Sequence, residues 1–490
     1  MNKILTATLV AGSLWFSVAQ AAVLTDIRVN SYPQKIRIVF DLEGESFYNV
    51  TRAENGLTIT LLSCEAAGEV VGTTKVADWV VREVRVAQGQ GNLYLSIPFE
   101  YPVNYEVLPL SAPSRLVVDF GRSFTKIEQG SKLAEGLEYF GVVKGIEEGY
   151  MVAEILKVDP KKVDIFPRLA SASPTLLESV GEFFNPWAKK KVPHFFRDKV
   201  SGIAEQGQAT AAVNGTYFSY SGRPLGVLMI DQELVSYPIS DRTALILTDD
   251  NRAFIDNIAL NAYAVIGGSR YDITGINEPR ANGGDLIVYT KYYGELTETP
   301  GNGYELTALD GKVTEIRIGN SRIPENGLVL SAGALYAENL LTAVNRGDPI
   351  EVSIEVMPYS SSVTGILKHL VGGGPRLLKS GMIYITKYEE KFRRDIARGR
   401  AARTAVGILE DGQLLFVTVD GKPRRKIKRG EGYSLGMTLT ELAYFMQSLG
   451  ARDALNLDGG GSSTLVVRGA VLNRPTDGKP RMVGNAILFK

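Results

Sequence analysis

Residues 456–467 read NLDGGGSSTLVV, an apolar strand that ends in a carboxylate and is followed by three glycines, two serines and a second apolar strand. Three successive glycines remove every Cβ from the turn, so the backbone can adopt positive φ and a ligand can approach the main chain. Successive N–H groups in such a turn form a concavity that binds anions, and Ser462 and Ser463 add donors beside Asp458. The segment therefore predicts a site for a phosphorylated sugar. A tight turn whose serines satisfy only backbone groups is the alternative.

A helix is predicted immediately upstream of this strand. Thr438 and Glu441 have the spacing of a capping box, the apolar residues between 442 and 449 share one face, and Gly450 stands where a C-terminal cap belongs. The helix leads through a short loop into the strand of residue 456. Asp458 is therefore expected at the carboxyl end of a strand, where open sheets commonly bind ligands.

The remaining C-terminal part alternates strands with a few helices. Residues 404–419 predict a hairpin that turns at Asp411 and Gly412, many strands are expected between 211 and 355, and helices are expected over 176–184 and 195–206. The fold class predicted for residues 137–490 is α+β, built on mixed sheets.

The N-terminal part has a strand period throughout. Ile36, Ile38, Phe40 and Leu42 fall on one face, and the same alternation recurs at 57–61, 93–97 and 116–120. Residues 22–125 therefore predict a small all-β sandwich domain. A polar stretch over 126–136 is expected to be the linker to the second domain.

Composition excludes several classes of function. The 490 residues include 54 basic and 54 acidic side chains, so no overall charge draws the chain to nucleic acid, and we expect no nucleic-acid partner. Cys64 is the only cysteine, which rules out an intramolecular disulfide. Two histidines in the whole chain argue against a zinc site. We expect no cofactor and no metal site, although binding of Ca²⁺ or Mg²⁺ by carboxylates near Asp458 is left open.

The N-terminus has the pattern of a secretory signal peptide. Lys3 precedes an apolar run over residues 4–18, and Ala19-Gln20-Ala21 matches a cleavage site before residue 22. The run is shorter than the roughly 20 residues that span a bilayer. We therefore expect a leader over 1–21, an exported protein in the periplasm or outside the cell, associated with the envelope, and no permanent membrane span. A membrane anchor is the alternative.

Six motifs occur in the order of a known family. The motifs are VNGTYF (213–218), GGGPRLLKSG (372–381), ARTAVGI (402–408), GMTLTELA (436–443), NLDGGGSST (456–464) and RMVGNAILF (481–489). Together they resemble the phosphodiester glycosidase family, whose founding activity uncovers mannose 6-phosphate by removing N-acetylglucosamine from a phosphodiester. In the first domain, IRIVFDL and RLVVDF resemble the AMIN domain, which implies attachment to peptidoglycan. A packing domain without a ligand is the alternative there.

The resemblance implies cleavage between the anomeric carbon of a sugar and a phosphodiester oxygen in an envelope or extracellular glycan. Such cleavage passes through an oxocarbenium-like state and uses a carboxylate as nucleophile or base. Because a phosphate leaving group is already acidic, cations and N–H donors that stabilise its charge can replace much of the work of a general acid.

Asp458 and Arg403 are the predicted catalytic residues. Asp458 would face the anomeric carbon, and Arg403 would clamp the phosphate through its planar fork. The predicted substrate-binding residues are Asn214, Gly373, Gly374, Thr404, Gly459, Gly460, Gly461, Ser462, Ser463, Arg481 and Asn485.

Each of these assignments has a structural alternative. Asp458 could accept hydrogen bonds from the glycine turn, Arg403 belongs to a run of basic residues over 391–400, and Asn214 could cap a turn before a glycine. Glu441 is explained by helix capping, and the Asp-Gly setting of Asp420 is explained by a turn.

One departure from the family pattern bears on activity. Family members commonly have His-Pro before the Arg-Thr pair, whereas this chain has Ala401-Ala402. The main rival function is therefore a non-catalytic protein that binds envelope polysaccharide or peptidoglycan. A phosphodiesterase that cuts the P–O bond is a further alternative. The sequence does not identify the sugar, the acceptor or the oligomeric state.

Overall fold

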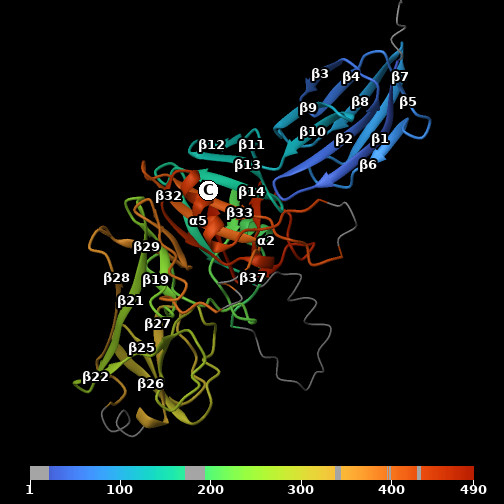
Figure 1. The fold of residues 1–490 in the computed structure, drawn as a ribbon. Helices are drawn as coiled ribbons and strands as arrows, with labels where there is room; N and C mark the ends of the chain where they lie inside the picture. Colours follow the sequence, from blue (N-terminus) through green and yellow to red (C-terminus); the bar gives the residue numbers. More distant parts are fainter. Residues whose placement is uncertain (1–20, 172–193, 337–343, 394–395, 397–398, 427–431) are drawn as a thin grey trace, which may run out of the picture. The chain divides into compact units, whose positions relative to one another are not determined.

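The computed structural model describes residues 21–171, 194–336, 344–393, 396, 399–426 and 432–490. Residues 1–20 of the predicted leader and the helix predicted over 176–184 lie outside this range. Strands make up 52% and helices 6% of the described residues, so the predicted α+β class is confirmed with a strong weight toward strands. The chain divides into two compact units (Figure 1). The N-terminal unit holds the described residues up to Thr125, and the C-terminal unit holds most of the rest.

The N-terminal unit consists of two five-stranded sheets. The first sheet has the order β5-β1-β2-β10-β9, with β1 (Ala22–Ser31), β2 (Lys35–Glu43), β5 (Cys64–Ala66), β9 (Tyr105–Ser111) and β10 (Ser114–Gly121). The second has the order β3-β4-β8-β7-β6, with β3 (Tyr48–Ala53), β4 (Gly56–Leu61), β6 (Gly72–Lys75), β7 (Glu83–Gly89) and β8 (Asn92–Pro98).

The predicted alternation in this unit is confirmed. Ile36, Ile38 and Phe40 are fully buried on one face of β2, and the corresponding apolar residues of β4, β8 and β10 are buried in the same way. Phe99, just after β8, and Phe120 of β10 bring the two sheets together with ring centroids 6.1 Å apart. The unit is therefore the all-β sandwich that the sequence predicts.

The C-terminal unit is centred on one long sheet. Its strands run in the order β11-β13-β14-β33-β32-β34-β30-β31, where β11 spans Phe124–Ile127, and β12 pairs with β13. Their bounds are β12 (Ser131–Ala134), β13 (Leu137–Ile146), β14 (Gly149–Val158), β30 (Arg376–Lys379), β31 (Met382–Ile383), β32 (Arg403–Leu409), β33 (Leu414–Val419) and β34 (Ala451–Asn456). β32 and β33 form the predicted hairpin at Gly412, which has φ of 85°.

Four further sheets complete this unit. One is β15 (Ile165–Leu169), β38 (Asn485–Phe489), β17 (Ala211–Asn214), β35 (Leu465–Val467) and β36 (Ala470–Val471), and a small one is β16 (Asp198–Lys199) with β37 (Met482–Val483). Another is β19 (Glu233–Ser236), β18 (Leu228–Ile230), β29 (Leu367–Gly372), β20 (Thr243–Thr248), β21 (Ala253–Ile266) and β22 (Ser269–Asp272), with β28 (Ile350–Pro358) paired to β21. The last is β23 (Gly275–Ile276), β24 (Leu286–Tyr289), β27 (Gly327–Gly333), β25 (Gly303–Leu309) and β26 (Lys312–Ile318).

The main core of the unit lies between the long sheet and the sheet that contains β38. Phe416 of β33 and Phe489 of β38 meet edge to face with ring centroids 4.7 Å apart, and Val406, Leu455 and Ile487 surround them. Burial of side chains of this size stabilises a fold by roughly 1.5–3 kcal/mol each. The core therefore holds β34, the strand before the glycine turn, rigidly between its neighbours.

Two predictions for this unit are wrong in detail. The polar stretch over 126–136 is not simply a linker, because Ser131 and Lys132 pair with β13 as part of β12. The helix predicted over 195–206 is shorter, since α2 spans Val200–Gln206 and is preceded by β16. Among the described residues, no helix is long and apolar enough to cross a membrane.

Candidate functional site

The glycine turn follows a strand whose position is fixed from both sides. Helix α5 (Leu439–Ser448) begins with the predicted capping box, in which Thr438 and Glu441 exchange hydrogen bonds, and Gly450 ends it with φ of 88°. The helix packs on β30 and β34. Because β34 lies between β32 and β30, Asp458 emerges at the end of an interior strand, as predicted.

The turn itself is a single 3₁₀ turn, η1 (Gly460–Ser462), and not the amide concavity that the sequence predicts. Gly460 has φ of 62°, whereas Gly459 is extended. Four amides of this segment already have protein acceptors: those of Asp458 and Gly460 donate to the carbonyls of Gly215 and Ala402, and those of Ser462 and Ser463 donate within the turn. An anion bound here must therefore be held mainly by side chains.

Gly461 is required for a packing reason. A Cβ at this position would overlap Nη2 of Arg481 and Oδ2 of Asp477. The Arg481 guanidinium thus lies directly on the α-carbon of the turn. Arg481 donates from Nε and Nη2 to Asp477 Oδ2 at 2.9 and 2.8 Å, and its Nη1 lies 3.5 Å from Oγ of Ser462. Its side chain keeps 33% of its surface exposed, so it can still meet a ligand.

Asn214 joins the turn to two strands. Its Nδ2 donates to the carbonyl of Asp458 at 2.7 Å, and its Oδ1 accepts from Thr404 Oγ1 at 2.8 Å and from the amide of Thr464 at 3.1 Å. Asn214 and Thr404 are both almost completely buried. Both side chains therefore hold the turn in place, and their role in binding substrate stays a prediction.

Asn485 also has its carbonyl oxygen occupied. Oδ1 of Asn485 accepts from the amide of Thr216 at 2.8 Å, and it lies so close to Gly215 that a Cβ there would overlap it. This contact fastens β38 to the segment after β17. Asn485 therefore supports the segment that leads to the site, and its contact with substrate stays a prediction.

Gly373 and Gly374 form the wall next to the turn. A Cβ on Gly373 would overlap Leu455, and the carbonyl of Gly374 accepts from Tyr217 Oη at 2.9 Å and from Asn456 Nδ2 at 3.1 Å. The two predicted glycines therefore lie beside the turn. The missing Cβ of Gly373 allows its segment to approach β34 closely.

Asp458 has the electrostatic character of a reactive carboxylate. Burial raises its pKa to about 6, while hydrogen bonds from Ser462 and the Gly459 amide and the charge of Arg481 act in the opposite direction. Taken as a whole, the residue is only partly buried. Clefts that combine burial with a nearby cation are frequent sites of such shifts. The carboxyl group is therefore half charged near pH 6.

Tyr217 is a site residue that the sequence reasoning did not single out. Burial and the charge of Asp458 raise the pKa of its phenol, and Asn456 Nδ2 donates to its oxygen at 2.9 Å. The residue lies within the VNGTYF motif, which was the available signal. Its hydroxyl group is neutral at any physiological pH and is held next to the carboxylate.

Arg403 lies beside the turn, and each nitrogen of its guanidinium donates to one backbone carbonyl. Its Nε donates to the Met437 carbonyl at 2.9 Å, Nη1 to Ile396 at 3.2 Å and Nη2 to Gly399 at 3.1 Å. The residue is 3% exposed, and burial lowers its pKa. Arg403 anchors Ile396 and Gly399 to the loop before α5, and its predicted role as phosphate clamp stays a prediction. Arg403 does not lie on a solvated face.

Two acidic residues outside the turn differ from their predicted roles. Glu441 caps α5 as expected and also pairs with Arg400, 2.7 Å away. Asp420 is more than a turn residue: it is buried, accepts from the Arg474 amide at 2.8 Å, and burial raises its pKa to about 6. Nearby Glu154 has its pKa raised to about 7, mainly by burial and further by the charge of Asp420.

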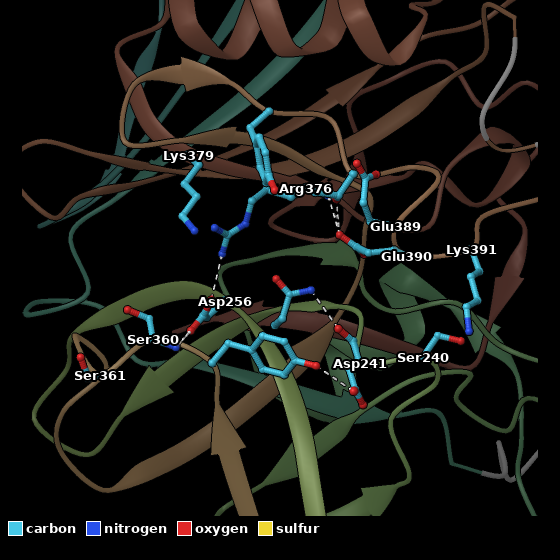
Figure 2. Close-up of a pocket in the computed structure, with 14 residues that line it drawn as sticks. Ser240, Asp241, Asp256, Ser360, Ser361, Arg376, Lys379, Glu389, Glu390 and Lys391 are labelled. Carbon is cyan, nitrogen blue, oxygen red and sulfur yellow. Dashed lines mark hydrogen bonds and ion pairs between the residues drawn. The ribbon is translucent and has the colours of Figure 1, made fainter.

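A large cavity opens on the other side of the Gly374 segment. It has a volume of about 800 Å³ and includes Arg376, Lys379, Asp256 and Glu390 in its lining (Figure 2). None of the residues predicted from the sequence lines it. Among the described residues, no group of three or more His, Cys, Asp and Glu side chains is arranged to hold a metal ion.

Comparison with known proteins places these observations in a family context. Residues 303–490 match the family model of phosphodiester glycosidase. The mouse N-acetylglucosamine-1-phosphodiester alpha-N-acetylglucosaminidase is 28% identical over 165 residues, which is 32% of this chain and 30% of the mouse protein. The human protein of the same name is 31% identical over 121 residues, 22% of this chain and 21% of its own length. This chain thus matches less than a third of these curated relatives.

A solved structure shares the fold over nearly the whole chain. A hypothetical protein from Synechocystis is 21% identical, covers 96% of this chain and 80% of its own chain, and superposes with a TM-score of 0.59. The two units therefore have a fold that is also found elsewhere. The distant homology to phosphodiester glycosidases covers the segments that contain Arg403, the glycine turn and Arg481.

Proposed function

We propose that the chain is a phosphodiester glycosidase that hydrolyses the bond between the anomeric carbon of a sugar and a phosphodiester oxygen. One observation carries the proposal: Asp458 ends an interior strand of the family-matched region, is only partly buried, and has its pKa raised to about 6 beside Arg481. A carboxylate near neutrality next to a cation suits a reaction in which positive charge forms on the sugar and negative charge on the phosphate.

Asp458 acts on the sugar side of the reaction. Above pH 6 its carboxylate either activates a water molecule or stabilises the oxocarbenium-like state directly. Tyr217 and the Gly374 carbonyl hold the adjacent wall through the hydrogen bond between them. These fixed groups position the sugar ring, and the bond between them leaves the Asp458 carboxylate free of a hydrogen bond from Tyr217.

Arg481, and not Arg403, takes the phosphate side. It is already aligned on the turn by Asp477, which also pairs with Arg424 at 3.1 Å. An arginine presented by a carboxylate can bind two phosphate oxygens in parallel, and Ser462 lies next to it as a further donor. This arrangement supports departure of the phosphate without the histidine that other family members commonly have before the Arg-Thr pair.

The cellular setting follows from the same proposal. We infer that residues 1–21 direct export to the periplasm or the outside of the cell, that the substrate is an envelope or extracellular glycan, and that the N-terminal unit attaches the enzyme to peptidoglycan. The apolar run over 4–18 and the small all-β sandwich support this inference. Binding of the purified chain to isolated peptidoglycan, measured by co-sedimentation, tests the attachment.

The rival function is a protein that binds envelope polysaccharide without cleaving it. Ala401-Ala402 in place of His-Pro, and turn amides that already have acceptors, favour it. Incubation of the purified chain with the methyl phosphodiester of N-acetylglucosamine 1-phosphate in isotopically labelled water separates the alternatives. Label in the released sugar supports the glycosidase, label in the phosphate indicates attack at phosphorus, and intact substrate supports the rival.

A further inference from the structure

The 800 Å³ cavity beyond Gly374 is a candidate for a second binding site. Its walls come from four separate parts of the C-terminal unit: the loop before β20, the first residues of β21, the loop after β28, and the segment from β30 to residue 391. Its volume lies within the range of about 300–1,000 Å³ typical of small-molecule sites. Figure 2 shows Arg376 reaching toward Asp256, with Lys379 beside it and Ser360 and Ser361 near one end.

The charges of the lining indicate an uncharged ligand. Three cations, Arg376, Lys379 and Lys391, meet four anions, Asp241, Asp256, Glu389 and Glu390, which leaves a net charge of minus one. Three of the acids are already engaged: Asp256 with Arg376, Asp241 with Tyr359, and Glu390 with donors that include Thr243 Oγ1 at 2.7 Å. A site for phosphate would carry an excess of positive charge. A ligand rich in hydroxyl groups matches a wall that mixes donors and acceptors.

Arg376 holds an unused donor in this wall. It is 2% exposed, and its Nη2 donates to the Ile255 carbonyl and lies 3.3 Å from Asp256 Oδ1. Among the described residues its Nε has no acceptor. A buried donor without a partner is costly and uncommon in native proteins, so it calls for an acceptor supplied from elsewhere. A small turn of the guanidinium would present this donor to a ligand oxygen.

Two exposed tyrosines add the apolar surface that a sugar ring requires. Tyr359 and Tyr384 line the cavity and are 63% and 49% exposed. Tyr359 Oη donates to Asp241 Oδ2 at 2.9 Å, and Lys379 Nζ lies 5.9 Å from the Tyr384 ring centre. Aromatic side chains combine a flat apolar face with a polar tip. Rings restrained in this way lose little freedom when a ligand packs on them.

The cavity is connected to the proposed catalytic turn through shared wall residues. Glu390 Oε2 lies against Gly374, where a Cβ would overlap it, and the carbonyl of the same glycine accepts from Tyr217. Tyr217 in turn is influenced by the charge of Asp458. One short segment thus forms a boundary of both sites.

We propose that this cavity binds an uncharged pyranose unit of the glycan whose phosphodiester bond is cleaved at Asp458. The assignment of the glycan as ligand rests on the proposed function, but the binding of a neutral sugar does not. The exposed faces of Tyr359 and Tyr384 pack on the ring, while Arg376 and Lys379 donate to its hydroxyl groups and the carboxylates accept from them.

The test measures binding of neutral oligosaccharides to the full chain carrying Asp458→Asn, so that turnover does not interfere. Cellotetraose, maltotetraose and tetra-N-acetylchitotetraose are each titrated at concentrations around 1 mM, the weak end of the affinity scale, by saturation-transfer NMR and calorimetry. We expect at least one of them to bind, and Tyr384→Ala or Ser361→Trp to weaken its binding by about tenfold or more. Both positions are exposed, so the fold should survive.

Tyr388→Ala provides the matched control. Tyr388 belongs to the same segment, is 74% exposed and lies near Lys387 in the way that Tyr384 lies near Lys379, but it does not line the cavity. The Tyr388→Ala variant should bind the oligosaccharides as tightly as the Asp458→Asn chain without this second change. The proposal is overturned if none of the three oligosaccharides binds, if Tyr384→Ala and Ser361→Trp leave binding unchanged, or if inorganic phosphate binds in the cavity in their place.

The proposed function and this inference fail separately. Absence of hydrolysis by the wild-type chain, with oligosaccharide binding that depends on Tyr384, would reject the glycosidase and keep the sugar site. Hydrolysis of a short methyl phosphodiester without any oligosaccharide binding would keep the glycosidase and reject the sugar site.

Discussion

The guanidinium of Arg481 rests on the α-carbon of Gly461, in the space that any side chain at position 461 would fill. This contact explains why the turn needs a glycine there without positive φ, and it brings a cation to the carboxylate of Asp458. The glycine turn therefore makes room for the side chain of an arginine, whereas the sequence predicted a turn whose backbone amides bind an anion.

Substitution of Gly461 by alanine should displace Arg481 and disturb the site. We expect a loss of about 10²-fold in kcat/KM, since displacements near 1 Å have effects of this size. The pH at which activity reaches half its maximum should also rise, because Arg481 lowers the pKa of Asp458. Gly301→Ala is the control, as a Cβ there meets open space. Equal activity of both variants would contradict the account.

The pH profile of kcat/KM should report Asp458. Its folded pKa is about 6, so the carboxylate required on the sugar side accumulates as pH rises through 6, and activity should rise with it. A profile from pH 4 to 9 with a methyl phosphodiester of N-acetylglucosamine 1-phosphate measures this limb. Activity that falls through pH 6 would instead assign Asp458 the role of an acid.

Arg481 and Arg403 should respond differently to the same change. Arg481→Gln should reduce kcat/KM by roughly 10²-fold or more with little effect on stability, because its side chain is partly exposed and acts on the phosphate. Arg403→Gln should lower the free energy of unfolding by on the order of 3 kcal/mol, because three backbone carbonyls lose their donors. Urea unfolding and steady-state kinetics on both variants decide. Reversal of the two patterns would restore Arg403 as the phosphate clamp.

Glu154 should make stability depend on pH. Its folded pKa is about 7 against a usual 4.5, so the folded state holds the proton more tightly. This contribution is fully present below about pH 4.5 and is lost as pH rises through 7. Glu154→Gln keeps an acceptor for Tyr139 Oη, which donates to Glu154 at 2.6 Å, and should flatten this part of the profile. Urea unfolding at pH 5 and pH 8 measures the free energy of unfolding of the wild type and the variant. If this free energy changed with pH equally in both proteins, Glu154 would not be the group responsible.

Local signals made part of the fold predictable. The capping box of Thr438 and Glu441, the turn at Gly412 and the alternation of Ile36, Ile38 and Phe40 each depend on residues close together in sequence, and the structure has all three. The pairing of β12 with β13 was missed because a polar edge strand has no hydrophobic period to reveal it.

The site was less predictable, because its contacts are distant in sequence. The amides of Asp458 and Gly460 donate to the carbonyls of Gly215 and Ala402, and Arg403 donates to the carbonyl of Met437. Because these acceptors are distant in sequence, the motifs did not predict that these donors already have partners within the protein. Asp458 and Arg481 lie in one place because β35 and β38, which come soon after them in the chain, both pair with β17. The cavity of Arg376 was missed since four separate segments build it.

The central claim is that the Asp458 carboxylate acts on the anomeric carbon of a sugar phosphodiester. Hydrolysis of the methyl phosphodiester of N-acetylglucosamine 1-phosphate by the wild-type chain and by Asp458→Asn, with circular dichroism to verify folding, tests it most directly. The account predicts release of free sugar by the wild type and a loss of roughly 10³-fold or more in the folded variant. Turnover by Asp458→Asn within a few-fold of the wild type would contradict it.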